Sequence, residues 1–459
     1  MKLVLLSGGS GKRLWPLSND ARSKQFLKVL KDKNGESQSM IQRVWSQLKE
    51  AGLEHSTLIS TSSTQVDMIM NQLDPVRDLI VEPERRDTFP AVCLAASYLY
   101  SYKKVDPNEV IVVLPVDPYV EQQFFNKVKE MEKVLKESNA NIALMGVQPT
   151  FPSEKYGYII PKHEDRAPWN EVKYFKEKPS TALAKEFIEL GGLWNCGVFA
   201  FKLNYMITRL QNMGRPTTFE KLLKEYDSLP KDSMDYAVIE KEKNVVVLKY
   251  EGYWKDIGTW NTLTDEMSVQ QVGEGIISQD SVNTHLINEL HIPVTIIGGS
   301  NLVVAASPDG ILVSDKEKSP MIKQLLKGDQ PQPMYEEKRW GWYKTLEHNK
   351  IDAEKEVLTK RLVIHKGKNL SYHMHINRQE VWMIVKGEGE FVLDGSIKRV
   401  REGEILEIPA RAKHSIRALE DLEIIEVQTG SLLTIEDELS VSTNWEECIP
   451  EMNKSSIVI

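Results

Sequence analysis

Short apolar runs rich in Val, Ile and Leu alternate with longer segments of mixed polarity through the first half of the chain. Such runs are typical of buried strands, and strands that alternate with helical segments favour a parallel sheet covered by helices. The runs predicted to be strands are residues 2–6, 57–60, 79–82, 110–114 and 142–146. We therefore predict an α/β fold whose first domain is built on a mainly parallel sheet.

One helix of this domain can be delimited from its residues. Ser39 and Gln42 have the spacing of a capping box, and Gly52 is a suitable stop signal. The apolar residues between them recur at helical spacing: Ile41, Val44, Trp45 and Leu48. This stripe predicts a helix that packs against the sheet.

The pattern changes towards the C-terminal half. Strand-like runs at 302–306 and 310–314 flank a Pro-Asp-Gly turn, and a polar, proline-containing stretch at 327–333 has the composition of a linker. From 339 to 430, closely spaced strand-like runs with glycine turns predict a closed sandwich or barrel. The predicted units are residues 1–270, a small β-rich connector and linker at 271–334, and a C-terminal β domain at 335–459.

The composition is that of a folded protein, since 41% of the 459 residues are hydrophobic and 27% are charged. A formal net charge of −8 argues against a general nucleic-acid binder, which needs a basic surface. The three cysteines are too few and too scattered for a disulfide framework or a four-thiolate zinc site, which favours a reducing compartment. The apolar run at residues 3–6 is shorter than a signal-peptide core, and no run approaches a membrane span. We therefore expect a cytoplasmic protein that binds neither nucleic acid nor membranes.

A glycine-rich loop at residues 7–17 directly follows the first predicted strand. Its glycines allow backbone N–H groups to approach a phosphate, and Lys12 and Arg13 add positive charge. The loop lacks the Ser or Thr that follows the lysine of a Walker A motif, and Leu14 replaces the last glycine of a dinucleotide fingerprint. Taken alone, the loop leaves two interpretations open: a phosphate-binding loop and a solvated turn.

The segments 8–17 and 24–26 resemble the signature of sugar-nucleotide pyrophosphorylases, in the form found in bacterial mannose-1-phosphate guanylyltransferases. Further motifs of that family follow in order at 82–88, 114–117, 156–159, 175–179, 194–199, 235–240 and 254–260. Two positions depart from the family pattern, because Asp87 replaces the usual Asn and Pro118 replaces a common His. The resemblance identifies the first domain as a nucleotidyltransferase domain and implies a Rossmann-like fold on a mixed, mainly parallel sheet.

The resemblance implies an enzyme that converts GTP and mannose 1-phosphate to GDP-mannose and diphosphate. In that reaction, an oxygen of the sugar phosphate attacks the α-phosphorus of GTP, so two anionic reactants must be brought together. No protein nucleophile is needed, and Mg²⁺ is the expected cofactor because a hard cation prefers carboxylate and phosphate oxygens. Asp117, just past the 110–114 strand, and Asp256, before a glycine turn, are the expected Mg²⁺ ligands.

The family motifs also imply residue roles. The expected nucleotide-binding residues are Leu6, Gly8, Gly9, Gly11, Arg13, Glu82, Asp87 and Thr88. The expected catalytic residues are Arg13, Lys24, Asp117, Lys178 and Asp256. The expected sugar-binding residues are Gly157, Glu177, Lys178, Asn195 and Asp235. Arg13 and Lys24 would contact the triphosphate and the leaving diphosphate, and Lys178 the sugar phosphate.

Each of these residues has an ordinary structural interpretation as well. In isolation it could equally be a turn, capping or surface residue, and only the order and spacing of the motifs favour chemistry. The aromatic residues Tyr236, Trp254 and Trp260 lie in the same motifs, and we interpret them as packing residues.

The C-terminal β domain contains a second set of candidate ligands. His373 and His375 would share one face of a strand, with Glu380 on the next strand and His414 on a third. Their surroundings resemble the two cupin motifs, and the domain resembles the type II phosphomannose isomerase domain. The set predicts a cupin β-barrel that holds Zn²⁺ or another divalent metal. The isomerase pattern is incomplete, since His373 replaces the usual Gln and Arg411 a usual Gly, so a degenerate or purely structural cupin stays open.

Two other functions are compatible with the sequence. The same chemistry on another sugar 1-phosphate, such as a manno-heptose, would need only a few different loop residues. A catalytically silent regulatory subunit that binds GDP-mannose is the alternative from a different class. Against it stands the joint presence of the cationic and acidic residues expected for catalysis. From the resemblance we also expect a homo-oligomer.

Overall fold

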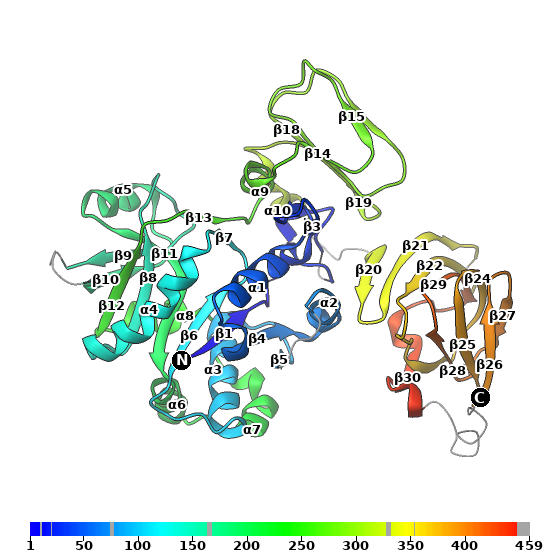
Figure 1. Cartoon of the computed structure of the whole chain (residues 1–459), viewed down its shortest axis with the longest axis horizontal. Helices are drawn as coiled ribbons and strands as arrows, with labels where there is room; N and C mark the ends of the chain where they lie inside the picture. Colours follow the sequence, from blue (N-terminus) through cyan, green and yellow to red (C-terminus); the bar gives the residue numbers. More distant parts are fainter. Residues whose placement is uncertain are drawn as a thin grey trace.

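The computed structural model describes residues 1–9, 12–19, 21–73, 78–162, 168–326, 332–352 and 354–447. An α/β unit built on a large sheet comes first, a small group of short strands follows, and a C-terminal unit made of strands completes the chain (Figure 1). This arrangement agrees with the predicted α/β fold followed by a β-rich connector and a β-barrel. Residues 327–331 of the predicted linker lie outside the described residues.

The first unit is built on a nine-stranded sheet with the order β5-β4-β1-β6-β11-β8-β12-β10-β9. The strands are β1 Lys2–Leu6, β4 Thr57–Ser62, β5 Leu79–Glu82, β6 Val110–Pro115, β8 Ile142–Val147, β9 Tyr158–Pro161, β10 Asn170–Lys176, β11 Leu193–Lys202 and β12 Val245–Tyr250. β1 pairs in parallel with β4 and β6, as do β4 with β5 and β8 with β12. β11 is antiparallel to both β6 and β8, so the sheet is mixed. All five runs predicted to be strands lie in it.

Helices cover both faces of this sheet. They are α1 Met40–Glu50, α2 Val66–Gln72, α3 Thr88–Ser97, α4 Gln123–Ser138, α5 Thr181–Glu189, α6 Leu203–Asn212, α7 Phe219–Lys224, α8 Met234–Ala237 and α9 Trp260–Glu266. One apolar cluster joins α1 and α4 to the sheet, and a second joins α3 and α6 to it. The predicted capping box of α1 is present, since the Ser39 hydroxyl accepts from Gln42 N and the Gln42 side chain accepts from Ser39 N. The capping box therefore gave the start of this helix, and the amphipathic pattern gave its buried face.

The described residues of the connector form six short strands. One sheet consists of β14 Gln271–Val272, β16 His285–Asn288, β18 Leu302–Ser307 and β19 Gly310–Asp315, and β15 Gly275–Ile277 pairs with β17 Val294–Ile296. The β18–β19 turn lies against the C-terminal part of the glycine-rich loop, because Ser307 Oγ donates to Pro16 O at 2.9 Å. Gly310 has a φ of +151°, and a Cβ there would lie 2.5 Å from Trp15 Cζ2, so a larger residue would displace the turn. The connector thus supports the loop that opens the first unit.

Two facing sheets form the C-terminal barrel (Figure 1). The first contains β20 Tyr335–Lys338, β21 Gly341–Lys350, β22 Glu356–Ile364, β29 Leu422–Gly430, β24 Arg378–Lys386 and β27 Ile405–Ile408. The second contains β26 Ser396–Arg401, β25 Glu388–Leu393, β28 His414–Ala418, β23 Tyr372–His375 and β30 Glu438–Ser442. Residues that alternate inward along these strands, such as Trp382 and Ile416, form the core between the sheets.

Among the described residues, no helix combines the length and the apolar character that crossing a lipid bilayer requires.

Candidate functional site

Two aspartates that are far apart in the sequence meet at a small two-stranded ladder. β7 (Pro118–Val120) pairs antiparallel with β13 (Trp254–Asp256), with Asp256 opposite Pro118. This register brings Asp256 beside Asp117, the residue just before β7. The two acids therefore lie where a strand of the main sheet ends, the edge at which open α/β sheets bind ligands.

A lysine ammonium lies between the two carboxylates. Lys24 belongs to the 3₁₀ turn Lys24–Phe26, and its Nζ lies 2.8 Å from Asp117 Oδ2 and 3.4 Å from Asp256 Oδ1. The same nitrogen donates to Ile257 O at 3.2 Å. Three residues predicted to act together thus converge on one point.

The charges of this cluster stabilise one another. Burial lowers the pKa of Lys24, but the two aspartates outweigh it and raise the pKa above its ordinary value. Burial likewise raises the pKa of Asp117, and the Lys24 ammonium reverses this and lowers it. At neutral pH the lysine is therefore charged and Asp117 is ionised, as coordination of a cation requires.

A cavity of about 180 Å³ opens beside the aspartates. Its lining contains both acids and four of the five residues expected to bind the sugar: Asp117, Asp256, Gly157, Glu177, Asn195 and Asp235. The fifth, Lys178, is tied to the lining because its Nζ donates to Glu177 Oε1 at 2.6 Å. Residues from several separate motifs thus surround one space.

Gly157 keeps this cavity open. A Cβ at this position would lie 2.5 Å from Glu177 Oε2 and 2.6 Å from Phe175 Cζ, closer than real side chains approach. Its carbonyl oxygen accepts from Asn195 N at 2.8 Å, which fixes the loop against β11. The absence of a side chain, rather than backbone freedom, therefore accounts for glycine here.

Hydrogen bonds orient the polar groups of the lining. Asn195 Nδ2 donates to Asp235 Oδ1 at 2.8 Å, and Asn195 Oδ1 accepts from Gly197 N at 3.1 Å. Burial, together with the nearby Glu177 carboxylate, raises the pKa of Asp235 to about 7. Asp235 can therefore donate as well as accept near neutral pH, which suits a ligand rich in hydroxyls.

The residues predicted to bind the nucleotide follow the neighbouring edge of the sheet. Leu6 ends β1, Gly8 follows two residues later, and Glu82 ends β5. A Cβ on Gly8 would lie 3.5 Å from Glu82 Oε1, so this loop and the end of β5 adjoin. Glu82 accepts hydrogen bonds from Tyr226 OH at 2.8 Å and from Ser60 Oγ at 3.3 Å.

The remaining residues that are expected to bind the nucleotide differ in their contacts. Gly9 O accepts from Ser23 Oγ at 2.7 Å, which ties the glycine-rich loop to the Lys24 turn. Asp87 caps α3 with a φ of 70°, and Thr88 Oγ1 accepts from Met234 N at 2.9 Å, which joins α3 to the helix that carries Asp235. Arg13 is exposed to solvent. Gly11 lies outside the described residues.

Sequence reasoning missed the aromatic wall of the cavity. Tyr156 and Trp254 both line it, with ring centroids 5.5 Å apart, and Trp194 packs against Tyr156 at 4.9 Å. Trp254 is therefore more than the packing residue that its sequence context indicates. Its position two residues before Asp256 was the available signal, since alternate residues of a strand face the same side.

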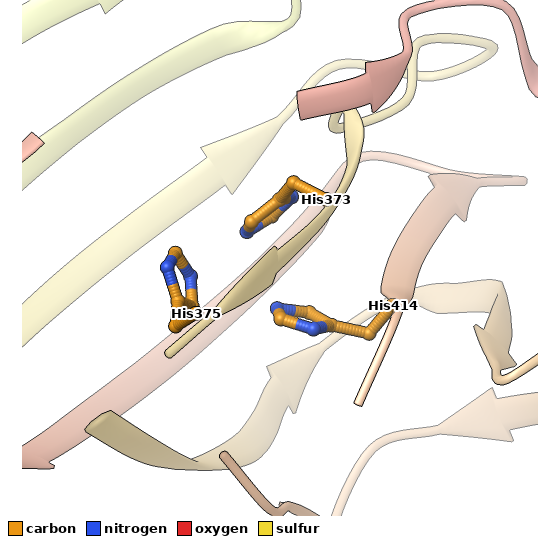
Figure 2. Close-up of side chains that lie close together, drawn as sticks. All are labelled: His373, His375 and His414. Carbon is orange, nitrogen blue, oxygen red and sulfur yellow. The ribbon is translucent and has the colours of Figure 1, made fainter. Parts of the chain in front are cut away.

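The second predicted cluster is also assembled. His373 and His375 of β23 and His414 of β28 point their rings towards one another (Figure 2), and their ligand nitrogens lie within 4.8 Å of each other. All three side chains are buried. Glu380 of β24 contacts two of them, with its carboxylate oxygens 3.1 Å from His375 Nε2 and 3.4 Å from His414 Nε2.

The ring orientations suit a metal ion. His373 Nδ1 lies 2.8 Å from Ser371 O and His414 Nδ1 lies 3.0 Å from Ala412 O, so each ring donates from Nδ1 and leaves Nε2 as the free ligand atom. His414 Nε2 is buried and forms no hydrogen bond, and the Glu380 Oε2 atom lies 3.4 Å from it. Burial and the neighbouring His414 lower the pKa of His373 to about 4, which keeps its lone pair available at neutral pH.

A large cavity adjoins the three histidines. Its volume is about 910 Å³, and its lining includes four basic side chains: Lys338, Arg339, Lys360 and Arg378. Trp340 and Tyr343 add aromatic surface. The same lining includes the acidic side chains Asp67, Glu356, Glu380, Glu426 and Glu438, so the cavity offers both cationic and anionic groups beside the metal-binding cluster.

Comparisons with known proteins match the N-terminal and the C-terminal parts of the chain to two different families. Residues 2–271 match the family described as nucleotidyl transferase, and residues 331–442 match the family described as mannose-6-phosphate isomerase C-terminal. A mannose-1-phosphate guanylyltransferase of Salmonella montevideo is 28% identical over 485 residues, covering 96% of this chain and 98% of that protein. The alginate biosynthesis protein AlgA of Pseudomonas putida is 29% identical over 471 residues, covering 95% and 94%.

A solved structure also resembles much of the chain. The structure described as mannose-1-phosphate geranyltransferase from Thermus thermophilus has 28% identity and a TM-score of 0.58. The match covers 71% of this chain and 98% of that one. Because the first family match spans more than half of the 459 residues, this protein belongs to the nucleotidyl transferase family.

Proposed function

We propose that the protein is a mannose-1-phosphate guanylyltransferase, which makes GDP-mannose and diphosphate from GTP and α-D-mannose 1-phosphate. The observation that carries the proposal is the contact of Lys24 with both Asp117 and Asp256 beside a cavity lined by Gly157 and Glu177. Relatives that match nearly the whole chain and bear this name support the choice of sugar and base.

The donor set at the aspartates fits Mg²⁺. Two carboxylates, one with a lowered pKa, are hard oxygen ligands that already hold a cationic group between them. When bound there, Mg²⁺ supplies charge neutralisation at the α-phosphate of GTP. Lys24 and Arg13 would then bind the triphosphate and stabilise the negative charge that builds up on the leaving diphosphate.

The sugar side holds the second reactant in place. Lys178 would bind the phosphate of mannose 1-phosphate, and its Nζ donates to Glu177 Oε1 at 2.6 Å. Glu177, Asn195 and Asp235 would bind the sugar hydroxyls. Fixing both reactants in this way aligns the attacking phosphate oxygen with the α-phosphorus, which together with charge neutralisation accelerates the reaction without a protein nucleophile.

We also propose where the three units of the chain begin and end. Residues 1–270 would form the nucleotidyltransferase domain, 271–334 the connector and linker, and 335–459 the cupin domain. A cytoplasmic location and self-association stay predictions from the sequence and the resemblance.

The test is a panel of reactions with Mg²⁺, each nucleoside triphosphate in turn, and mannose 1-phosphate. We expect diphosphate release with GTP and mannose 1-phosphate and much less with other pairs. Release with a manno-heptose 1-phosphate instead would favour another sugar. Binding of GDP-mannose without any diphosphate release would favour the silent regulatory subunit and contradict the proposal.

We propose mannose-6-phosphate isomerase activity as a second function, located in the cupin. The three clustered histidines favour it, because they adjoin a cavity of about 910 Å³ that is lined by both basic and acidic side chains. Their nitrogens fit Zn²⁺ or another divalent first-row metal, which would polarise the oxygens of a bound sugar phosphate. The basic residues would bind the phosphate.

Interconversion of mannose 6-phosphate and fructose 6-phosphate by the full chain tests this second function. Zn²⁺, Mn²⁺ and Co²⁺ are added separately after removal of bound metal. Metal binding without interconversion would contradict the isomerase proposal and favour a structural cupin.

A further inference from the structure

The strand that opens the C-terminal unit also contacts the first unit. β20 lies beside α2 (Figure 1), and its Glu337 is 6% exposed. Glu337 Oε2 accepts from Gln72 Nε2 at 3.2 Å and from Asn71 Nδ2 at 3.3 Å, and both amides belong to α2. A buried carboxylate must be hydrogen-bonded to be tolerated, so this contact links the two units firmly.

Gln72 extends the link to the nucleotidyl site. Its Nε2 carries two hydrogens, and it also donates to Phe26 O at 3.1 Å. Its Oε1 accepts from Ser39 Oγ at 2.6 Å. With all these groups buried, the Gln72 amide has one orientation, and Glu337 is one of the acceptors that set it.

The carbonyl that accepts from Gln72 belongs to Phe26, the last residue of the turn that starts with Lys24. A shift of Phe26 therefore moves the lysine whose ammonium contacts Asp117 and Asp256. A second contact ties the same region to β20, because the Arg22 guanidinium lies 5.2 Å from the centroid of the Tyr335 ring.

We propose that Glu337 is a positioning residue for the Lys24–Phe26 turn, so that the C-terminal unit contributes to nucleotide binding in the first unit. The proposal rests on the proposed guanylyltransferase function. We expect the effect to fall on the nucleotide, because Lys24 would contact the triphosphate, whereas Glu177 and Asn195 on the sugar side are held by Glu240 and Asp235.

The experiment compares full-length wild type with E337A, E337Q and N71A in Mg²⁺-dependent turnover. We expect E337A to raise the KM for GTP roughly five-fold and to leave the KM for mannose 1-phosphate unchanged. E337Q keeps a carbonyl acceptor for Gln72 and should stay near wild type. N71A is the matched control, because Asn71 shares Glu337 as a partner but is not bonded to Phe26.

Melting temperatures separate positioning from general damage. If E337A does not fold, E337D replaces it, since the shorter side chain withdraws the oxygen from Gln72 but keeps the charge. An unchanged KM for GTP, an equal rise in both KM values, or a defect in E337Q equal to that in E337A would overturn the positioning role.

Diphosphate release by the wild-type protein in the same experiment tests the proposed guanylyltransferase function separately. Wild type that releases no diphosphate would contradict the guanylyltransferase itself. In that case the dissociation constant for GTP, measured by calorimetry with Mg²⁺, gives the same comparison between the variants. Wild type that binds no GTP would remove both proposals together.

Discussion

The two candidate sites keep their ligand atoms together in different ways. In the first, Asp117 and Asp256 would repel each other, and the ammonium of Lys24 joins them. Their side chains stay about one-third exposed, at 35% and 34%. In the second, the imidazoles of His373 and His414 are fixed by backbone carbonyls and are buried in a barrel.

This difference bears on how each site receives a cation. At the first site, a divalent ion has to share the aspartates with a lysine, so the site must rearrange as substrates and metal enter. At the second, the ligand nitrogens already lie within 4.8 Å of one another, and the rearrangement needed is withdrawal of the Arg378 guanidinium, whose Nη2 lies 2.9 Å from His375 Nδ1 and 3.3 Å from His375 Nε2. The open site suits a reaction in which both substrates and product exchange, and the closed site suits a resident metal.

The largest expected effect comes from Asp256→Ala, which removes one of the two acids. We expect Mg²⁺-dependent turnover to fall by about 10²–10³-fold, because charge at the α-phosphate is no longer neutralised. Diphosphate release measures it. The fold and the metal content of the cupin should be unchanged. Asp265→Ala is the control, because Asp265 is an exposed acid that pairs with Lys255. Full activity of the Asp256 variant would refute the metal assignment.

The histidine cluster should respond independently of the first site. For His373→Ala we expect the affinity for Zn²⁺ to fall by roughly 100-fold or more, because one of three ligands is lost. Metal analysis after dialysis measures it. His55→Ala is the control, because the His55 side chain is 70% exposed and lies far from the cluster in sequence. Unaltered metal binding would show that the three histidines are structural.

A smaller effect separates the sugar side from the nucleotide side. Gly157→Ala places a Cβ 2.5 Å from Glu177 Oε2, so the carboxylate must move away from its sugar-binding position. We expect the KM for mannose 1-phosphate to rise about ten-fold while the KM for GTP stays constant. Steady-state kinetics with each substrate varied in turn would measure both. A change in the KM for GTP alone would contradict the assignment of this cavity to the sugar.

The smallest effect concerns stability. The pKa of Asp235 is raised to about 7 in the folded protein, against a value near 4 in the unfolded chain. Its contribution to the free energy of unfolding is therefore fully present below about pH 4 and is lost as the pH rises through about 7. Asp235→Asn should remove this loss, since an amide does not ionise and its oxygen still accepts from Asn195. In thermal melts between pH 5 and pH 8, the melting temperature of the variant should rise relative to that of wild type as the pH rises. If the melting temperatures of the two proteins change equally with pH, the raised pKa is contradicted.

Local sequence patterns determined much of this protein. The five β runs, the capping box of α1 and the alternation of His373 and His375 each depend on neighbours within a few residues. Collinear motifs also gave polar residues that line the cavity beside the aspartates. The place of Trp254 in that lining was missed because an aromatic residue in a strand has the same pattern whether it packs in a core or lines a cavity.

Contacts between distant segments were decided only by the tertiary structure. Lys24 precedes Asp256 by 232 residues, and the register of β7 against β13 brings the two acids within reach of it. Glu337 belongs to no motif and gains its place only because α2 and β20 pack together. Sequence patterns report periodicity and local hydrogen bonding, whereas the meeting of two distant side chains depends on how whole elements pack, which no local pattern records.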